Sequence, residues 1–362
     1  MYDVPHLRFP EFGGEWRKYK LAEICSFFSG GTPSSSKKEY YDGNIPFIRS
    51  GELHMDKTEL FITEVGLDNS AAKIVDVGDL LLALYGATSG DIAISQIKGA
   101  INQAILCIRT TQNKKFIESV WKKHVEKLLQ TYLQGGQGNL SADIVKNISF
   151  YFAESNEQIK LAKFITLLDE RIATQNKIIE KQQSLIKGLA AQLTQSGIPN
   201  VRLCDCLECH SSTLQEDCVS ATGSYPVYGA TGLIGYTNNY AYNGESILIV
   251  KDGSSVGSLS YVNDHFSVIG TLNYLTAYKE HSILYLYYAL MTFNFTPYIT
   301  GMAIPHIYFK DYGKAKLFYP SIEKRIRIAS LLHNIEQKLA VEQNLVKSLS
   351  VQKSYLLRML FI

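Results

Sequence analysis

The chain contains an internal duplication, because residues 78–193 align with residues 245–360 at a constant offset of 167. In this register residues 86–90 fall on residues 253–257, and each of these short segments begins and ends with glycine. A repeat of about 170 residues is far longer than the unit of a solenoid protein. The pattern therefore predicts two copies of one arrangement, each a globular segment followed by a long helix.

The two copies differ in length. Upstream of the repeat the offset grows to 182, because residues 21–24 match residues 203–206, so the first copy carries about 15 extra residues (182 − 167). A chain of 362 residues is long enough to bury two separate cores. We predict four segments: a globular domain at 1–152, a coiled-coil helix at 153–197, a second globular domain at 198–319 and a second coiled-coil helix at 320–362.

Both globular segments are predicted to be mixed α/β, with many short strands bounded by Gly, Asn or Asp turns. The expected strands are 45–49, 80–85, 91–95 and 105–108 in the first segment, and 246–251, 259–262 and 272–276 in the second. A helix expected at 115–133 has its counterpart at 281–298, which is richer in β-branched and aromatic residues.

Apolar residues recur every seven positions in both long helices, which predicts coiled-coil packing. A helix of about 40 residues would be about 60 Å long and too narrowly apolar to fold alone. We expect the two helices to pack antiparallel, related by an approximate two-fold that also relates the globular domains. The predicted seam consists of Ile165, Leu168, Ile172, Ile179, Ile186, Leu189 and Leu193 in the first helix, and Leu332, Ile335, Leu339, Val346, Leu349, Leu356 and Leu360 in the second.

Polar residues interrupt the same heptad frame. They are Gln175 and Gln182 in the first helix, and Glu342, Gln352 and Lys353 in the second. Polar seam residues can fix the register and the partner of a coiled coil, or they can simply rotate toward solvent as the seam drifts. The sequence leaves both interpretations open.

The charge of the chain does not by itself indicate nucleic-acid binding. The net charge is only +2, and residues 201–320 hold 6 Lys and Arg against 9 Asp and Glu. Any DNA binding must therefore depend on local patches or on basic partners. The same segment holds 15 of the 23 tyrosines, which suit either a polar-aromatic recognition surface or the ordinary filling of β-sheets.

Hydropathy argues against a membrane protein. The longest apolar run, residues 283–291, is nine residues long, well short of the roughly 20 that span a bilayer. The N-terminus has no secretory pattern. We expect a cytoplasmic protein whose six cysteines are reduced.

Two short motifs suggest cofactors only superficially. Residues 229–235 have the spacing of a dinucleotide-binding glycine turn, but the residues around them are those of a hairpin rather than of a strand followed by a helix. The string Cys206-Leu-Glu-Cys209-His matches a haem attachment site. The repeat places Ile24 and Phe27 at the two cysteine positions, so apolar, inward-facing roles fit better than haem or zinc.

Catalytic motifs are missing from the sequence. It contains no Asn/Asp-Pro-Pro-aromatic tetrad of adenine methyltransferases, no Walker A loop and no metal-binding histidine pair. We therefore expect a protein without catalytic residues and without a metal site.

A set of short motifs, in a fixed order within the two-copy frame, carries a family resemblance. They are PHLRF at residues 5–9 with Phe12 and Trp16, residues 21–33 ending in Gly-Gly-Thr-Pro, YPVYGA at residues 225–230, GGQGNLS at residues 135–141, and Glu-Gln-Ile at residues 157–159. Over its whole length the chain resembles a specificity subunit of a type I restriction-modification enzyme. It departs from the family pattern at Lys324-Arg325, where Glu-Gln is usual, and at residues 301–306, which replace the glycine-rich loop.

The resemblance implies a division of labour between subunits. Each globular domain would be a target recognition domain that reads one half of a bipartite DNA sequence, and the helices would fix the spacer between the halves. The helices would also dock two methyltransferase subunits, which bring S-adenosylmethionine, and endonuclease/translocase subunits, which use ATP and Mg²⁺, would join them. This chain would itself bind double-stranded DNA and hold no cofactor.

The residues predicted to contact DNA are polar or aromatic side chains on glycine-bounded loops. Arg49 and Gln137 carry the donors for bidentate pairing with guanine and adenine. In the first domain the candidates are Thr32, Ser34, Ser35, Lys37, Tyr40, Arg49, Ser50, Tyr85, Thr88, Gln134, Gln137 and Asn139; in the second they are Ser211, Ser212, Tyr225, Tyr228, Thr231, Lys251, Ser254, Ser255 and His306.

Two other functions remain compatible with the residues. The chain could be the recognition subunit of a related two-part system, such as a fused or type II-like enzyme, and its neighbouring genes would distinguish the two. It could also be a coiled-coil scaffold that binds only protein, which the near-neutral charge favours.

Overall fold

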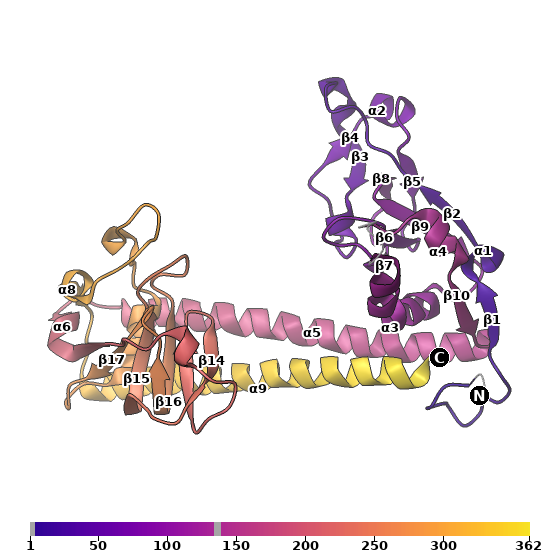
Figure 1. Ribbon diagram of the computed structural model, residues 1–362. Coiled ribbons are helices and arrows are strands. Elements are labelled where there is room, and N and C mark those ends of the chain that lie inside the picture. Colours follow the sequence, from indigo (N-terminus) through magenta and orange to yellow (C-terminus); the bar gives the residue numbers. More distant parts are fainter. Residues whose placement is uncertain (1–3, 134–138) are drawn as a thin grey trace. The chain divides into compact units, whose positions relative to one another are not determined.

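The computed structural model describes residues 4–133 and 139–362. The chain forms two compact units, and each contains one globular segment together with parts of both long helices (Figure 1). The first unit comprises Met1–Thr174 and Val346–Ile362, and the second comprises Gln175–Leu345. The mixed α/β class and the two-copy organisation expected from the sequence are confirmed.

The globular part of the first unit is built on two four-stranded sheets. The central sheet has the order β2-β9-β6-β7, the outer sheet has the order β4-β3-β8-β5, and β1 pairs with β10 beside them. The strands are β1 Arg17–Lys20, β2 Cys25–Ser29, β3 Tyr41–Ile48, β4 Phe61–Ile62, β5 Lys73–Val75, β6 Leu80–Ala83, β7 Ile92–Ile94, β8 Gly99–Ile101, β9 Ile105–Thr110 and β10 Ser149–Phe152. The helices are α1 Leu21–Ile24, α2 Glu64–Asp68, α3 Lys114–Leu133 and α4 Ala142–Asn147, with single 3-10 turns at Lys38–Tyr40 and Ser50–Glu52.

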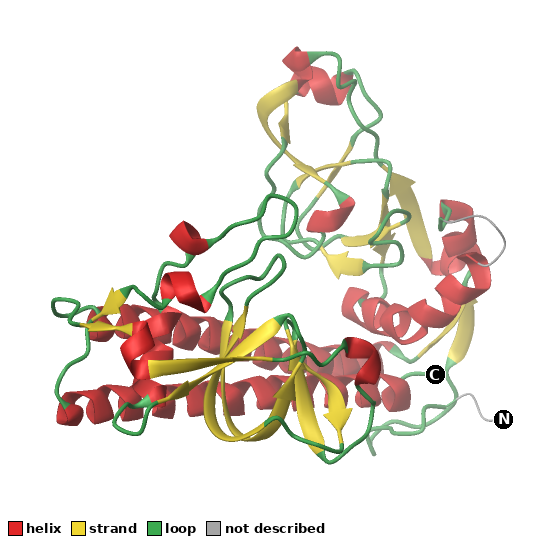
Figure 2. Cartoon of the chain, turned by 60° about the vertical axis from the view of Figure 1, so that its left-hand side comes forward, coloured by secondary structure: helices red, strands yellow, loops and turns green. Residues whose placement is uncertain are grey.

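The globular part of the second unit has one six-stranded sheet of order β12-β17-β15-β16-β13-β14, whose strands are yellow in Figure 2. A separate pair joins β11 to β18. The strands are β11 Val201–Arg202, β12 Leu207–Ser211, β13 Tyr225–Gly229, β14 Gly232–Thr237, β15 Tyr242–Val250, β16 Leu259–Val268, β17 Leu272–Ala277 and β18 Lys316–Leu317. The helices are α6 Leu203–Cys206, α7 Ile283–Met291 and α8 Phe309–Tyr312, with 3-10 turns at Glu216–Cys218 and Thr296–Tyr298.

The duplication is visible in the hydrogen bonds as well as in the strand order. The amide of Leu140 donates to Leu84 O at 2.8 Å, and at the offset of 167 the amide of Ile307 donates to Lys251 O at 2.9 Å. Gly90 and Gly257 are also equivalent, and both have φ of +85°, a conformation that a residue with Cβ adopts only at a cost. The glycine pattern of the sequence therefore marks one turn that is built twice.

The long helices are α5, Ser155–Thr194, and α9, Ile322–Leu360. In the first unit the beginning of α5 packs against the end of α9, with Leu161, Ile165 and Leu360 in one core cluster. In the second unit the end of α5 packs against the beginning of α9, with Ala190, Ile328 and Leu332 in one cluster. The two helices therefore run antiparallel, and the first core also receives Trp16, Phe116, Trp121 and Phe361.

The structure places all of the predicted seam residues on the inner side of the helices, where each is buried or half-buried. Leu167 and Leu185, which lie outside the seam, are exposed. The polar seam residues behave differently from one another. Gln175 donates to Glu342, Lys353 pairs with Asp169, and Gln352 is exposed. Gln182 is half-buried, and its buried side-chain oxygen accepts no hydrogen bond among the described residues.

The predicted strands each coincide with a strand of the structure, but one predicted helix is wrong at its C-terminal end. The helix expected at 281–298 is α7, Ile283–Met291, followed by a separate 3-10 turn. Ser282 caps its start by accepting from the amide of Tyr285 at 3.3 Å. The helix ends early because the side chain of Asn294 accepts from the amide of Thr296 at 3.0 Å, and because Pro297 cannot donate a helical hydrogen bond.

Candidate nucleic-acid interface

In the first unit, the candidates Thr32 and Tyr85 meet Gln103 at the turn between β8 and β9, residues 102–104. Thr32 Oγ1 donates to Gln103 Oε1 at 2.5 Å, and the amide of Leu84 donates to Ala104 O at 2.8 Å. Burial raises the pKa of Tyr85, and a hydrogen bond with Gln103 opposes that rise. Thr32, Tyr85 and Gln103 therefore form one polar cluster at this edge of the sheet, with Gln103 itself exposed.

The path of residues 30–32 explains why glycine precedes Thr32. A Cβ on Gly30 would lie 1.8 Å from Ile101 O, a distance that no side chain can occupy. The amide of Gly31 donates to the same carbonyl at 3.2 Å. Glycine is required here because the backbone lies directly against β8, and this close approach brings Thr32 to Gln103.

The loop after β6 lies beside this cluster. Thr88 is half-buried there, and Ser89 Oγ donates to Leu84 O at 3.0 Å. Asn139 is exposed and precedes Leu140, which bonds to the same Leu84 carbonyl. Both oxygens of Asp91 lie 2.9 Å from Nε2 of the exposed His54. The sequence-based prediction missed Gln103 and His54.

The second unit repeats this arrangement with different side chains. Its turn 269–271 is equivalent to 102–104, and the amide of Ile269 donates to Tyr228 O at 3.0 Å. The amide of Lys251 donates to Thr271 O at 3.0 Å. The middle residue of the turn, Gly270, donates its amide to Leu214 O at 2.9 Å, and the amide of Leu214 donates to Ser212 Oγ at 3.1 Å. The backbone at Ser212, Tyr228 and Lys251 thus converges on one short turn.

Further candidates lie at the same edge of the second unit's sheet. Asp252 pairs with His306 in an isolated β-bridge, and the amide of Gly253 donates to Pro305 O at 2.9 Å. Ser254 is exposed and Ser255 half-buried in the turn that follows. Ser211 Oγ, at the end of β12, donates to Asn273 Oδ1 at 3.0 Å.

Arg49 follows Ile48, which pairs with Ile101 just before the turn, and its guanidinium is engaged by a carboxylate. Its Nη2 and Nε donate to the two oxygens of the buried Glu52 at 2.8 and 3.2 Å. Burial alone would raise the pKa of Glu52, but the hydrogen bonds from Arg49 and Thr58 outweigh it and the pKa is lowered. The edge of the guanidinium predicted to pair with guanine is thus occupied by Glu52 in this structure.

The remaining candidates of the first unit lie on the segment before β3 or next to Arg49. Tyr40 is buried, and its hydroxyl accepts from Lys37 Nζ at 2.8 Å. Ser34 and Ser35 are exposed, and Ser50 is half-buried beside Arg49. Gln134 and Gln137 lie outside the described residues.

Besides Tyr228, two candidates of the second unit lie on the β13–β14 hairpin, which is the structure adopted by the glycine-rich residues 229–235. Tyr225 packs against Tyr240 and His265, with ring centroids 4.9 and 5.5 Å apart respectively. Thr231 is exposed at the turn. The prediction of a hairpin here, rather than a dinucleotide-binding turn, is confirmed.

The cysteines do not gather into a binding site. Among the described residues no three His, Cys, Asp or Glu side chains are placed to hold a metal ion. All six cysteines have free thiols, and burial raises the pKa values of Cys206 and Cys209 to about 11. Within the described part of the chain, no helix is both long and apolar enough to cross a membrane.

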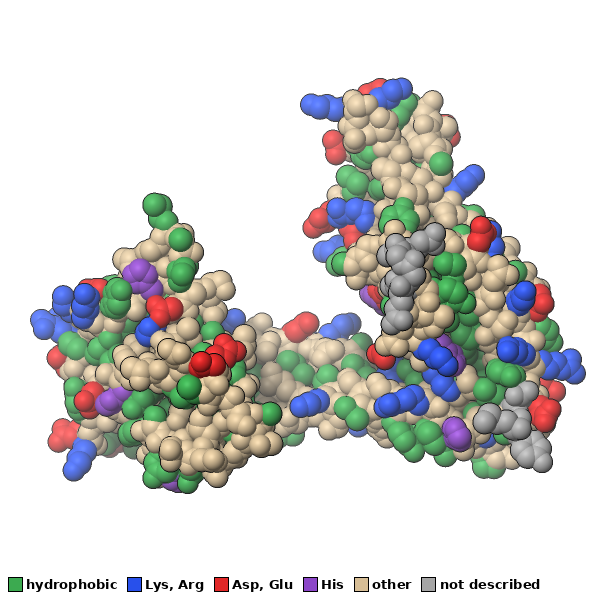
Figure 3. Space-filling view, in the orientation of Figure 1, with side chains coloured by type: hydrophobic (Ala, Val, Ile, Leu, Met, Phe, Trp, Pro, Cys, Tyr) green, Lys and Arg blue, Asp and Glu red, His purple; other side chains and the backbone are tan. Residues whose placement is uncertain are grey.

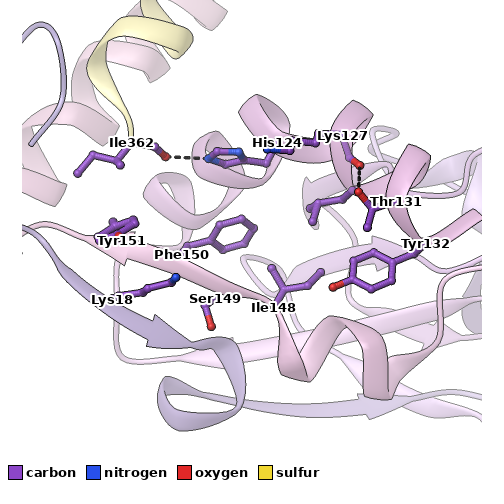
Figure 4. Close-up of a pocket in the computed structure, with 11 residues that line it drawn as sticks. Lys18, His124, Lys127, Thr131, Tyr132, Ile148, Ser149, Phe150, Tyr151 and Ile362 are labelled. Carbon is purple, nitrogen blue, oxygen red and sulfur yellow. Dashed lines mark hydrogen bonds between the residues drawn. The ribbon is translucent and has the colours of Figure 1, made fainter. Parts of the chain in front are cut away.

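A cavity of about 430 Å³ in the first unit lies apart from these clusters (Figure 4). It separates α3 from β10, and His124 Nε2 lies 2.7 Å from Ile362 O at its rim. Its lining consists of Lys18, His124, Lys127, Leu128, Thr131, Tyr132, Ile148, Ser149, Phe150, Tyr151 and Ile362. None of these residues belongs to the set predicted to contact DNA.

Comparison with known proteins gives matches over most of the chain. Curated relatives include the type I restriction enzyme EcoprrI specificity subunit of Escherichia coli, 22% identical over 89% of this chain and 87% of that protein. The MjaVIII specificity subunit of Methanocaldococcus jannaschii is 24% identical over 53% of this chain, and the match spans only 44% of that protein. The expectation of a non-catalytic subunit agrees with these relatives, which are named specificity subunits.

Solved structures show the same fold. The crystal structure of a type I restriction-modification S subunit from M. genitalium superposes with a TM-score of 0.70, at 17% identity, over 99% of both chains. A second solved structure concerns complex assembly and conformational transition of the type I R-M system. It superposes with a TM-score of 0.54 at 16% identity, over 94% of this chain and 96% of that chain.

The family model of the type I restriction modification DNA specificity domain matches this chain twice, at residues 13–182 and 199–350. Each match covers one globular segment and most of the helix that follows it. Two matches in tandem are what the internal repeat requires, and the chain belongs to the type I restriction-modification DNA specificity family.

Proposed function

We propose that the chain is the DNA-recognition subunit of a type I restriction-modification complex, and that each globular segment reads one half of a bipartite target. One observation carries this proposal. Equivalent turns, 102–104 and 269–271, share one backbone scaffold but carry different residues: Gln103 accepts from the Thr32 side chain in one unit, and Gly270 donates its amide to Leu214 O in the other. A repeated scaffold with altered side chains suits two readers of different base sequences.

Within this proposal the gathered loop residues contact bases or phosphates, and the antiparallel helices set the number of unread base pairs between the half-sites. The globular part of the second unit is net negative, with 6 Lys and Arg against 9 Asp and Glu in residues 201–320, and Lys251 pairs with Asp252. Partner subunits would therefore supply many of the phosphate contacts. A protein with this function would act in the cytoplasm.

The helices also offer a repeated surface for partners. Ile159 on α5 and Ile326 on α9 are equivalent at the offset of 167, and they are 54% and 56% exposed. An exposed apolar residue retained at the same place in both copies suits one kind of partner bound twice. We infer that two methyltransferase subunits dock here and bring S-adenosylmethionine, and that endonuclease/translocase subunits using ATP and Mg²⁺ join them.

The function is tested by expressing the chain with its neighbouring methyltransferase subunit in a host without other DNA methylation and mapping modified adenines across the genome. A two-part motif with a fixed gap is the expected result. If the partner is active alongside another specificity chain but produces no motif with this one, the proposal is wrong and a protein-binding scaffold becomes the better account.

The docking surface is tested separately by native mass spectrometry of the assembled complex. Ile159→Asp and Ile326→Asp should each remove one of two methyltransferase subunits, because each places a carboxylate in one copy of the apolar contact. Leu167→Asp is the matched control, since Leu167 is 55% exposed on the same helix but its equivalent is the polar Asn334. Loss of a subunit from the control, or retention of both in the two test variants, would contradict this docking surface.

A further inference from the structure

We propose that the loop Thr300–His306 of the second unit is an apolar wedge that inserts between stacked bases of the target DNA. The inference rests on the proposed DNA-recognition function and extends it from reading base edges to deforming the duplex. DNA-bending proteins commonly insert Ile, Met, Leu or Phe between base steps. Backbone hydrogen bonds between Thr300 and His306 close the frame of the loop. Its tip carries the exposed apolar side chains of Met302 and Ile304, and cationic and aromatic side chains lie next to the loop in the sequence.

The frame of the loop is held rigidly. The amide of Thr300 donates to His306 O at 2.9 Å, and the amide of His306 donates to Thr300 O at 2.8 Å. Gly301 has φ of +87°, and a Cβ there would lie 2.4 Å from Ile304 O. The amide of Gly253 ties the other side of the loop to Pro305 O. A wedge needs such a frame, because a flexible tip would lose much of its binding energy on becoming ordered.

The tip of this frame is apolar and unpacked. Met302 is fully exposed and Ile304 is 65% exposed, and neither belongs to a core cluster of the described residues. Figure 3 shows hydrophobic side chains at the end of the projection that carries this loop. Two exposed apolar side chains on a rigid loop have no stabilising role within the unit, which favours a role in binding.

The side chains that flank the loop in the sequence favour DNA over an apolar protein surface as its partner. Lys310 Nζ lies 5.1 Å from the centre of the Tyr308 ring, and Tyr308 is exposed. The rings of His306 and Tyr308 lie 5.0 Å apart. A cation and two exposed or half-exposed rings beside an apolar tip can contact a phosphate and flanking bases while the tip enters the stack.

Only one of the two half-sites should be deformed in this way. At the offset of 167, residues 301–306 (GMAIPH) correspond to residues 134–139, whose sequence is QGGQGN. The first copy therefore has no large apolar side chain at the positions of Met302 and Ile304. The wedge is a property of the second domain, and the base step that it opens belongs to the second half-site.

The test uses the chain assembled with its methyltransferase partner and a duplex carrying its mapped target. 2-Aminopurine replaces single bases at successive positions of each half-site, except the adenine that is methylated, because unstacking raises its fluorescence. The wild-type complex should raise the fluorescence at one step of the second half-site. The double variant Met302→Ser/Ile304→Ser should lose that signal and bind roughly tenfold more weakly. Ile198→Ser, which alters an 86% exposed residue of the same unit, should change neither.

The outcomes separate the wedge from the function on which it rests. A wild-type complex that fails to bind its mapped target would refute the recognition function itself. Tight binding with the fluorescence signal retained in the double variant would overturn the wedge alone. If the double variant instead releases a methyltransferase subunit in the absence of DNA, the loop is a protein contact and the wedge is wrong.

Discussion

The substitution Asp169→Asn should loosen the first globular segment from the long helices. Asp169 lies on α5, where Oδ2 accepts from Lys115 of α3 at 2.7 Å and Oδ1 pairs with Lys353 of α9. One carboxylate therefore joins three helices. Burial alone would raise the pKa of Asp169, but Lys115 and Lys353 outweigh it and the pKa is lowered.

The cost of this substitution can be worked out from the contacts. Asn keeps the shape of the side chain but loses the charge, so two charge-assisted hydrogen bonds of about 1.5–3 kcal/mol each are weakened. Lys115 retains Glu118 as a partner at 2.7 Å, whereas the largely buried Lys353 loses its carboxylate. Because Asp169 remains 29% exposed and solvent compensates in part, we expect a loss of about 3 kcal/mol in the free energy of local opening.

The same residue sets a pH dependence. A carboxyl whose pKa is lower in the folded state stabilises that state above its unfolded pKa of about 4. This stabilisation is lost as the pH falls from there through the lower folded value. The difference between the wild-type chain and Asp169→Asn should therefore shrink below about pH 4 and stay constant above about pH 5.

Hydrogen exchange of the full chain measures this effect locally. Amides of α3 should exchange about 100-fold faster in Asp169→Asn, while those of α7 stay unchanged. Glu336→Gln is the matched variant, because Glu336 is the equivalent of Asp169 and accepts from Tyr287 and Tyr288 at 3.0 and 2.6 Å. Because glutamine keeps an oxygen that can accept these hydrogen bonds, the free energy of local opening of α7 should fall by only about 1 kcal/mol. A fall of less than about 0.5 kcal/mol in the opening free energy of α3 in Asp169→Asn would refute this reasoning. An equal fall in the opening free energies of α3 and α7 in Asp169→Asn would also refute it.

Two further predictions concern single side chains. If the guanidinium of Arg49 reads a base, Arg49→Ala should reduce the discrimination against the wrong base at one position of a half-site by about 1–3 kcal/mol. Binding to single-base variants of the mapped target measures this discrimination. A uniform loss would instead mark a phosphate contact or the release of Glu52. In thiol titration of the folded chain at pH 8, the exposed Cys218 should react first. Cys206, fully buried with a pKa of about 11, and Cys107, buried with a pKa of about 12, should react only on unfolding.

Much of the fold could be predicted because it depends on short-range patterns. The apolar run at 80–83 became a fully buried central strand, and glycines at 86 and 90 marked a turn that recurs at 253 and 257. The heptads fixed which faces of α5 and α9 turn inward. In each case the period of the sequence matches the period of the structure, so the face that is buried can be read directly.

The candidate site was less predictable because it depends on contacts between distant segments. Gln103 resembles any other loop residue in the sequence, and its importance comes from the approach of Thr32, seventy-one positions away. Arg49 looked free to pair with guanine, but Glu52 occupies its donors. Sequence periodicity reports burial and not the identity of a polar partner, so the loops could be located while their hydrogen bonds could not.

The bond between Gln175 and Glu342 shows how the duplication constrains the helices. These residues are equivalent at the offset of 167, and Gln175 donates directly to Glu342 across the two helices. Identical residues at this point would meet themselves, and two glutamates would set carboxylates of like charge at hydrogen-bonding distance. A glutamine facing a glutamate removes that repulsion and adds a donor. At this position the two copies gain stability by having diverged, and the pair they form favours one register of the helices over slipped alternatives.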